Sequence, residues 1–222
     1  MLVRLRFVII AFTFFLYFAY LIKLIIMKKL ILLLFIPLVF TCSDDSSDDN
    51  SNNVDDTNPV YLDANGVTIK ARDWALVGDS GVVNGIAYTI VDVSTLETMI
   101  QNGDDVTRVC TSRILDMADI FYNDGQEENF NQNISSWDVS NVTNMAQMFK
   151  YLESFNQDIS SWDVGNVTNM NRMFDGAFEF NSDLSSWDVD NVTECYFFCY
   201  NTSSWDLPQP NFTNCSDETL CP

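Results

Sequence analysis

Histidine is absent from all 222 residues of the sequence. Without it the chain cannot form a Ser-His-Asp triad, a Cys-His nucleophile pair or a histidine-containing metal site. No CxxC motif occurs either, so the sequence offers no dithiol redox site. The side chains that remain for chemistry are mainly carboxylates, which could act as a glycosidase acid and base or as oxygen ligands.

Positive charge is also scarce, with 11 Lys and Arg against 31 Asp and Glu and a net charge of −20. Five of the cations and none of the acids precede Cys42, so the chain from Cys42 onward has 6 cations, 31 acids and a charge of −25. Nucleic acid and anionic lipid surfaces would repel such a chain. We exclude both as partners.

The first 41 residues are typical of targeting sequence. Residues 1–26 are strongly apolar, and we interpret them as an over-extended start or, alternatively, as a membrane-spanning segment. Residues 27–41 have the basic start and apolar run of a bacterial secretory signal peptide. The signal ends at Cys42, which resembles the acceptor of a lipoprotein signal. The resemblance implies lipidation of Cys42 and a membrane anchor.

Residues 42–59 are rich in Asp, Ser and Asn and have no cation, which predicts a solvated, disordered acidic tether. Ser43 and Asp44 after the cysteine also resemble a signal that sends lipoproteins to the outer face of the outer membrane; a spacer with no address is the alternative. The expected location is the bacterial outer membrane, lipid-anchored and surface-exposed.

Residues 60–105 predict a small α+β cap. Strand composition occurs at 67–70 and 86–91, and Asn84-Gly85 predicts a tight turn that pairs Val82 and Val83 with the second strand. Ser94 and Glu97 form a candidate capping box for a helix that Gly103 would end. We interpret this segment as the amino-terminal cap that a stack of repeats needs.

Three copies of one phrase, with a period of 25 residues, begin at Phe130, Phe155 and Phe180. A period of this length predicts a solenoid in which each copy is one coil. Within the first copy, Trp137-Asp138-Val139 predicts a short strand, and Met145, Met148 and Phe149 predict one face of a short helix. Degraded copies on both sides extend the predicted solenoid to residues 106–215, followed by a tail at 216–222.

The phrase FNQDISSWDVxNVTNMxxMF resembles the repeat of BspA-like bacterial surface proteins, which are distantly similar to leucine-rich repeats. The resemblance covers about residues 106–215. It implies a leucine-rich-repeat-like repeat solenoid of short strands and short helical segments on the outside of a bacterial cell. It implies no enzyme activity and no particular ligand.

Two columns of repeated side chains have competing interpretations. Asp138, Asp163 and Asp188 should form a ladder that either binds Ca²⁺ or caps the turns of its own coils, and we favour capping. A row of tryptophans would bind sugars if exposed, but we expect a buried core position. These tryptophans are Trp137, Trp162, Trp187 and Trp205.

The cysteines after Cys42 would lie in an oxidising compartment. Cys195 and Cys215 occupy the position of a methionine in the clean copies, so they should lie on adjacent coils within reach of a disulfide. Cys199 and Cys221 are then a candidate second pair that leaves Cys110 free, although five thiols allow other pairings. Bridges here would close the carboxyl-terminal end of the stack.

We predict a lipid-anchored cell-surface protein, not an enzyme, whose repeats bind a protein or a polysaccharide. An envelope enzyme acting on glycans through carboxylates and a structural coat protein are the alternatives. A pocket holding two carboxylates from non-equivalent repeat positions would favour the enzyme. No cofactor is expected apart from Ca²⁺ at the Asp ladder.

Overall fold

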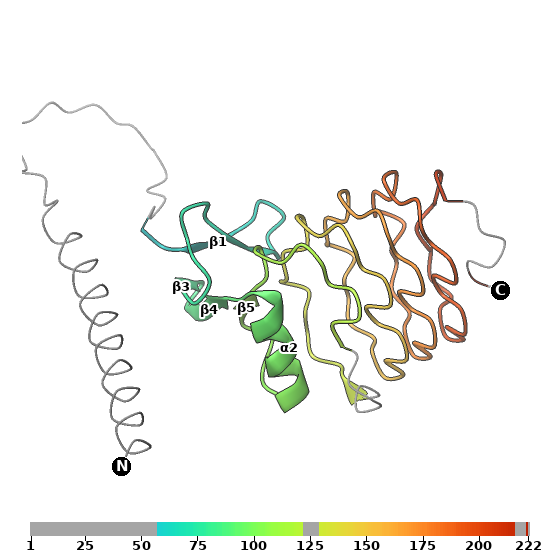
Figure 1. Ribbon diagram of the computed structural model, residues 1–222, viewed down its shortest axis with the longest axis horizontal. Coiled ribbons are helices and arrows are strands. Elements are labelled where there is room, and N and C mark those ends of the chain that lie inside the picture. The colour runs from blue at the N-terminus through green and yellow to red at the C-terminus, as the bar shows by residue number, and fades with distance from the viewer. Residues whose placement is uncertain (1–56, 122–128, 216–220, 222) are drawn as a thin grey trace, which may run out of the picture. The chain divides into compact units, whose positions relative to one another are not determined.

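The computed structural model describes residues 57–121, 129–215 and 221. The predicted lipidation site Cys42, the segments 1–26 and 27–41 and most of the tether and tail lie outside the described residues. Five strands and one helix come first, followed by successive coils of chain that lie side by side (Figure 1). No helix in the described part of the chain is long and apolar enough to cross a membrane.

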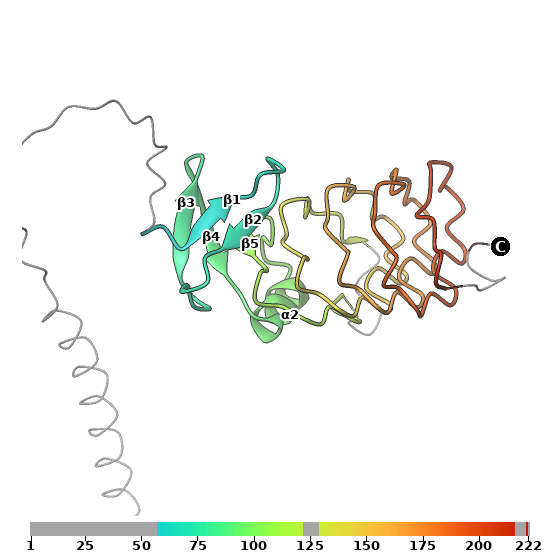
Figure 2. The same ribbon diagram turned by 90° about the horizontal axis from the view of Figure 1, so that it is seen from above.

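Two small sheets form the segment before the coils (Figure 2). In the first, Val60 lies opposite Ala71, and in the second Val83 lies opposite Ile86. Asn84 and Gly85 have φ values of 51° and 80°, which confirms the predicted two-residue turn. The antiparallel pairs are β1 (Val60–Leu62) with β2 (Ile69–Ala71) and β3 (Ser80–Val83) with β4 (Ile86–Ile90), and β5 (Val109–Cys110) runs parallel to β4.

The helix α2 (Val93–Asn102) begins earlier than the predicted capping box requires. Its N-cap is Asp92, whose Oδ1 accepts hydrogen bonds from Thr95 N at 2.8 Å and from Ser94 Oγ at 3.0 Å. The Ser94–Glu97 prediction was therefore wrong, because the Asp92 carboxylate satisfies the first-turn amide and places Ser94 inside the helix. Gly103 ends the helix with φ 72°, as predicted.

Backbone hydrogen bonds connect each coil to the next. Met145 N and Gln147 N donate to Asn169 O and Asn171 O at 2.8 Å, and Phe149 N and Tyr151 N continue the series to Met173 O and Asp175 O. The same series recurs one repeat later, where Arg172 N donates to Tyr196 O at 2.8 Å. Alternate amides thus pair with carbonyls 24 residues farther on, which aligns the copies of the repeat.

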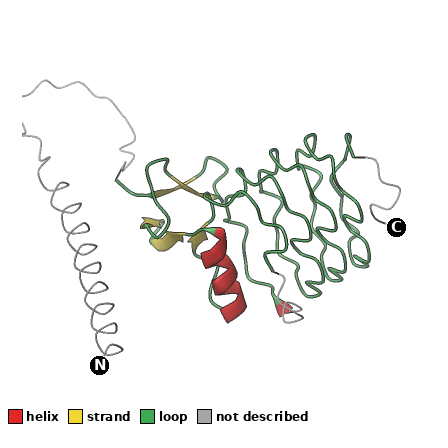
Figure 3. Cartoon of the chain, in the orientation of Figure 1, coloured by secondary structure: helices red, strands yellow, loops and turns green. Residues whose placement is uncertain are grey.

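The strand and helix predicted within each coil are absent from the described repeats, which consist of turns and irregular loops (Figure 3). Gln147 and Tyr151 have φ of 57° and 60°, and a positive φ every four residues is incompatible with an α-helix. Trp137-Asp138-Val139 is not a strand because the Asp138 carboxylate accepts from Ser140 N and bends the chain. Isolated parallel bridges instead join Asp116, Asn144, Asn169 and Glu194 in sequence.

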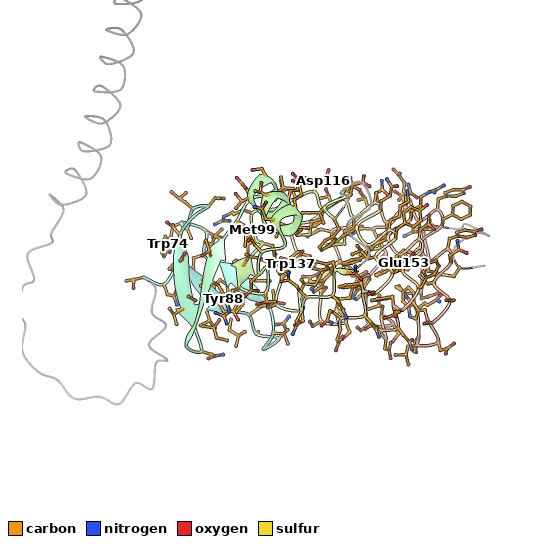
Figure 4. The ribbon with its side chains drawn as sticks, turned by 90° about the horizontal axis from the view of Figure 1, so that it is seen from below. Trp74, Tyr88, Met99, Asp116, Trp137 and Glu153 are labelled. Carbon is orange, nitrogen blue, oxygen red and sulfur yellow. A yellow bond between two sulfur atoms is a disulfide. The ribbon has the colours of Figure 1, made fainter. Side chains whose placement is uncertain are left out.

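The spacing of apolar residues still predicted the interior correctly. Met145, Met148 and Phe149 are fully buried, as are Val142 and Ile134. The side chains fill the inside of the coils from Trp137, next to the sheets, toward the carboxyl-terminal end (Figure 4). This core is continuous and also includes Leu96 of α2, so the helix packs on the first coil.

The tryptophans belong to this core, which confirms the core interpretation. Their exposed fractions are 0% for Trp137, 3% for Trp162, 5% for Trp187 and 7% for Trp205. Each indole N–H donates to a backbone carbonyl of the preceding coil, such as Trp137 Nε1 to Val106 O at 3.0 Å. The buried polar atom of each ring is therefore satisfied by the stacking itself.

Candidate functional site

The predicted Asp ladder consists of turn caps. Asp138, Asp163 and Asp188 each accept a hydrogen bond from the amide two residues on, at 3.1, 3.2 and 3.1 Å. Asp138 is buried and accepts further bonds from the hydroxyls of Ser112 and Ser140. These are the contacts of the turn-capping alternative.

The described ranges do not bring candidate metal ligands together. No group of three or more His, Cys, Asp or Glu side chains there could hold a metal ion. The capping bonds already engage one oxygen of each ladder carboxylate. Turn capping therefore gives a structural role to these three aspartates, which were the candidate Ca²⁺ ligands.

A second column, made of asparagines, joins neighbouring coils. Asn141 Nδ2 donates to Ser112 O at 3.1 Å, and Asn166 Nδ2 donates to Ser140 O at 2.7 Å. Asn191 continues the column to Gly165 O at 2.6 Å. This column therefore holds neighbouring coils together.

Both predicted cysteine pairs are disulfides in the structure. Cys195 pairs with Cys215 at a Cα–Cα distance of 6.1 Å, and Cys199 pairs with Cys221 at 4.9 Å. Cys110 is free and buried, and burial raises the pKa of its thiol. The two disulfides therefore anchor both ends of the segment from Cys195 to Cys199.

This segment and the residue after it present two exposed tyrosines and a partly buried phenylalanine. Tyr196, Phe197 and Tyr200, with Arg172 beside them, form what we call the terminal aromatic face. The ring centroids of Tyr196 and Phe197 are 4.1 Å apart, and those of Phe197 and Tyr200 are 4.9 Å apart. Tyr196 is 47% exposed and Tyr200 37%. The face is an apolar surface of this acidic chain.

Comparison between repeats shows that these aromatics are not part of the repeated pattern. The three positions hold Ala146, Gln147 and Lys150 in the first clean copy. They hold Asn171, Arg172 and Asp175 in the second copy and Tyr196, Phe197 and Tyr200 in the third. Sequence reasoning missed this site because it followed what the copies share, whereas the signal is the departure at outward positions.

One cation, Arg172, lies beside these aromatic residues, whereas Lys150 lies over the ring of Tyr151 at 4.9 Å. Lys150 and Arg172 are the only Lys or Arg after Arg113 in the sequence. The Arg172 guanidinium lies 5.2 Å from the ring centroid of Phe197 and 5.9 Å from that of Tyr196, within cation–π range. It also pairs with Asp175 at 3.4 Å. Burial raises the pKa of the Asp175 carboxyl, and the nearby Arg172 and Lys150 only partly offset this.

A polar groove of about 430 Å³ adjoins Tyr196, which is one of its lining residues. Asn171, Glu194 and Asn214 supply amide and carboxylate groups to it, together with the Thr193 hydroxyl. Asn171 Nδ2 donates to Glu194 Oε2 at 3.0 Å, while Asn171 Oδ1 accepts from Tyr196 N at 2.7 Å. The groove thus combines one ring wall with several fixed polar groups.

Another groove, of about 330 Å³, contains two carboxylates, those of Asp158 and Asp183. They occupy equivalent repeat positions, and each accepts a bond from the amide two residues on. Hydrogen bonds from Ser160 and Ser185 lower the pKa of both carboxyl groups. An acid–base pair needs one raised and one low pKa, so this groove does not resemble a glycosidase site.

Of the comparisons with known proteins, only the one with protein-family models gave a match. No curated protein and no solved structure matches the chain. The family model described as "Mycoplasma protein of unknown function, DUF285" matches residues 91–212, which is more than half of the chain. The match is compatible with the resemblance to BspA-like bacterial surface proteins. It covers α2, most of the coils and the terminal aromatic face, and the chain therefore belongs to the DUF285 family.

Proposed function

We propose that this chain is a lipid-anchored protein of the bacterial cell surface whose stacked coils form a leucine-rich-repeat-like solenoid that acts as a binding module. Lipidation at Cys42 and the tether at 42–59 would hold the module outside the outer membrane. The ligand is a protein or a polysaccharide at the cell surface. The proposal places no catalytic step on the chain.

The terminal aromatic face carries this proposal. Tyr196 and Tyr200 keep 47% and 37% of their surface in water, although the equivalent positions two copies earlier hold Ala146 and Lys150. Half-exposed aromatics stabilise the fold less than buried ones do, whereas Tyr and Arg are among the side chains that concentrate binding energy at interfaces. A binding role explains why the last clean copy departs from the others.

The carboxylates favour binding over catalysis. The grooves described above contain either one carboxylate, Glu194, or two equivalent ones, Asp158 and Asp183. Glycosidases need two carboxyl groups in different environments on opposite sides of the scissile bond. Repeated carboxylates that cap turns supply no such difference in environment.

Two measurements test the proposal. Protease treatment of intact cells should remove the coils, whereas protection until lysis would contradict a surface location. Full-length chain in detergent should capture soluble extracellular-matrix proteins or polysaccharides, and self-association without capture would favour the coat protein. Replacing Tyr196, Phe197 and Tyr200 by the residues of the first copy should abolish that capture, and Trp74→Gln, which changes an exposed aromatic of the cap, should leave it unchanged.

A further inference from the structure

We infer that the terminal aromatic face and the adjoining groove form a binding site for a neutral polysaccharide. The inference rests on the proposed binding function and names the ligand class of that surface. A hexose ring has one apolar face of C–H groups and a rim of hydroxyls. A matching site therefore needs an exposed aromatic ring next to amide and carboxylate groups.

The aromatic half of the site is formed by Tyr196, Phe197 and Tyr200. Their centroids lie 4.1 and 4.9 Å apart in sequence order, and adjacent ring planes are tilted by 43° and 41°. Arg172 lies against the first two rings and connects them to the preceding coil. The result is a faceted apolar surface, on which successive sugar rings of a chain would find successive aromatic partners.

The polar half is the groove beside Tyr196. Its Asn171 and Glu194 side chains are bonded to each other at 3.0 Å, so their remaining donor and acceptor atoms have a fixed direction. Thr193 and Asn214 line the same groove. Tyr196 belongs to both halves of the site. The hydroxyl groups of a sugar stacked on the Tyr196 ring would therefore lie close to these polar side chains.

The disulfides make the site rigid. Cys195 and Cys199 flank Tyr196 and Phe197, and their bridges to Cys215 and Cys221 fix both ends of the segment. Asn171 Oδ1 also accepts from Tyr196 N at 2.7 Å, which fixes the backbone between the bridges. A site that is rigid before binding loses less conformational entropy on association, which favours a weakly interacting ligand such as a sugar.

Charge and size favour a neutral saccharide. The chain from Cys42 has a charge of −25 and the groove itself contains Glu194, so a polyanion would be repelled. From the exposed fractions of its tyrosines the face offers about 170 Å² of aromatic surface, because one aromatic side chain has roughly 200 Å². A standard protein interface buries about 800 Å² per partner. The face is the size of an oligosaccharide site.

The test uses the full-length chain, purified in detergent and immobilised. Cellohexaose, laminarihexaose, mannohexaose and a galactan would be the neutral probes, and heparin the anionic probe. The decisive variant is Tyr196→Ala/Phe197→Gln/Tyr200→Lys, which reproduces the first copy. That copy adopts the same backbone, with φ 57° at Gln147 and 54° at Phe197, so the variant should fold. Trp74→Gln is the matched control, because Trp74 is an exposed aromatic (53%) of the cap.

We expect at least one neutral probe to bind and heparin not to bind. Affinity should fall at least tenfold in the triple variant and remain unchanged in Trp74→Gln. Opening the disulfides with reductant should also weaken binding. If the triple variant lacks the near-ultraviolet circular dichroism of a folded chain, Tyr200→Lys alone replaces it, with the same expectation of weakened binding.

Other outcomes overturn the inference in distinguishable ways. If no neutral probe binds but a matrix protein binds in a manner that depends on Tyr196, Phe197 and Tyr200, the binding function stands and the ligand class is wrong. Binding of neutral probes that is equal in the triple variant would place the site elsewhere. If neither saccharides nor proteins bind, the proposed function fails with the inference.

Discussion

The indole rings of Trp137 and Trp162 lie face to face, with centroids 6.5 Å apart and planes 6° apart. The two residues occupy the same position in successive repeats, and Trp162 Nε1 donates to Ile134 O of the coil before it at 3.3 Å. The same residue thus fills the core of its own coil and satisfies a buried carbonyl of its neighbour. One coil consequently depends on the next for both packing and hydrogen bonding.

Replacing Trp162 should show how much stability this contact provides. Trp162→Ala should lower the free energy of unfolding by about 3–5 kcal/mol because it leaves a cavity in the core. Trp162→Phe should cost about 1–3 kcal/mol, because the smaller ring leaves part of the core unfilled and the Ile134 carbonyl keeps only one of its two donors, Trp137 N at 3.0 Å. Urea denaturation measures both values. Trp74→Phe, at an exposed position, should stay within about 0.5 kcal/mol, and an equal effect at both sites would contradict the core role.

The asparagine column should depend on the amide donor. Asn166 Nδ2 donates to Ser140 O at 2.7 Å, so Asn166→Ala should lower the free energy of unfolding by about 1 kcal/mol. Asn166→Asp keeps the shape but places a carboxylate oxygen against the carbonyl, and it should be at least as destabilising at neutral pH. Thermal unfolding at pH 7 tests both variants. If Asn166→Asp matched the wild type, the bond would have no role.

Removal of the first bridge should destabilise the carboxyl-terminal end of the stack. Cys195 and Cys215 are separated by 20 residues, for which loop-closure entropy predicts a loss of about 3 kcal/mol in Cys195→Ser/Cys215→Ser. Chemical denaturation measures the loss. Alkylation of the unfolded, unreduced wild-type chain should modify Cys110 and none of the other four cysteines after Cys42. Alkylation at Cys199 or Cys221 would show that the second bridge is absent.

The capping carboxylates should make the protein acid-sensitive. Hydrogen bonds from Ser160 and Ser185 lower the pKa of Asp158 and Asp183 in the folded state. A lowered folded pKa means that the stabilisation is complete above the unfolded pKa of about 3.9 and is lost as the pH falls through the folded pKa. The first copy has Asn133 there, whose Oδ1 accepts from Ser135 N at 3.0 Å without titrating.

Asp158→Asn/Asp183→Asn should therefore lose less thermal stability than the wild type when the pH is lowered from 5 to 2. The reciprocal change Asn133→Asp should increase the loss over the same range. Melting temperatures across this pH range provide the test. A double variant with the same pH dependence as the wild type would show that these caps do not contribute to it.

The features that the sequence predicted correctly depend on local rules, whether or not the residues belong to a repeat. Burial of the tryptophans, the pairing of Cys195 with Cys215 and the turn at Asn84-Gly85 each follow from one local rule applied at a known position. Backbone conformation within the coil did not follow, because the 3.6-residue spacing of Met145, Met148 and Phe149 is also produced by consecutive turns. The positive φ of Gln147 distinguishes the two, and no glycine marks that position.

The candidate site was missed for a related reason. Tyr196, Phe197 and Tyr200 follow no period and match no motif, so only their position on the outside of the coil identifies them. That position could have been inferred by comparing the copies, because Gln147 and Lys150 are not core residue types. Departures from a repeat at outward positions are thus a better guide to binding surfaces than the repeat itself.

Duplication of one repeat tests the central claim that the coils are interchangeable units of one stack. A second copy of residues 155–179 inserted after Glu179 would restore every contact between neighbours and add one internal interface. Urea unfolding should then show a higher midpoint and a larger m-value, because more surface is buried in a single cooperative transition. Insertion of residues 155–166 alone, about half a repeat, should disrupt the stack. If the full duplication lowers the midpoint as much as the half insertion does, the coils do not stack as described.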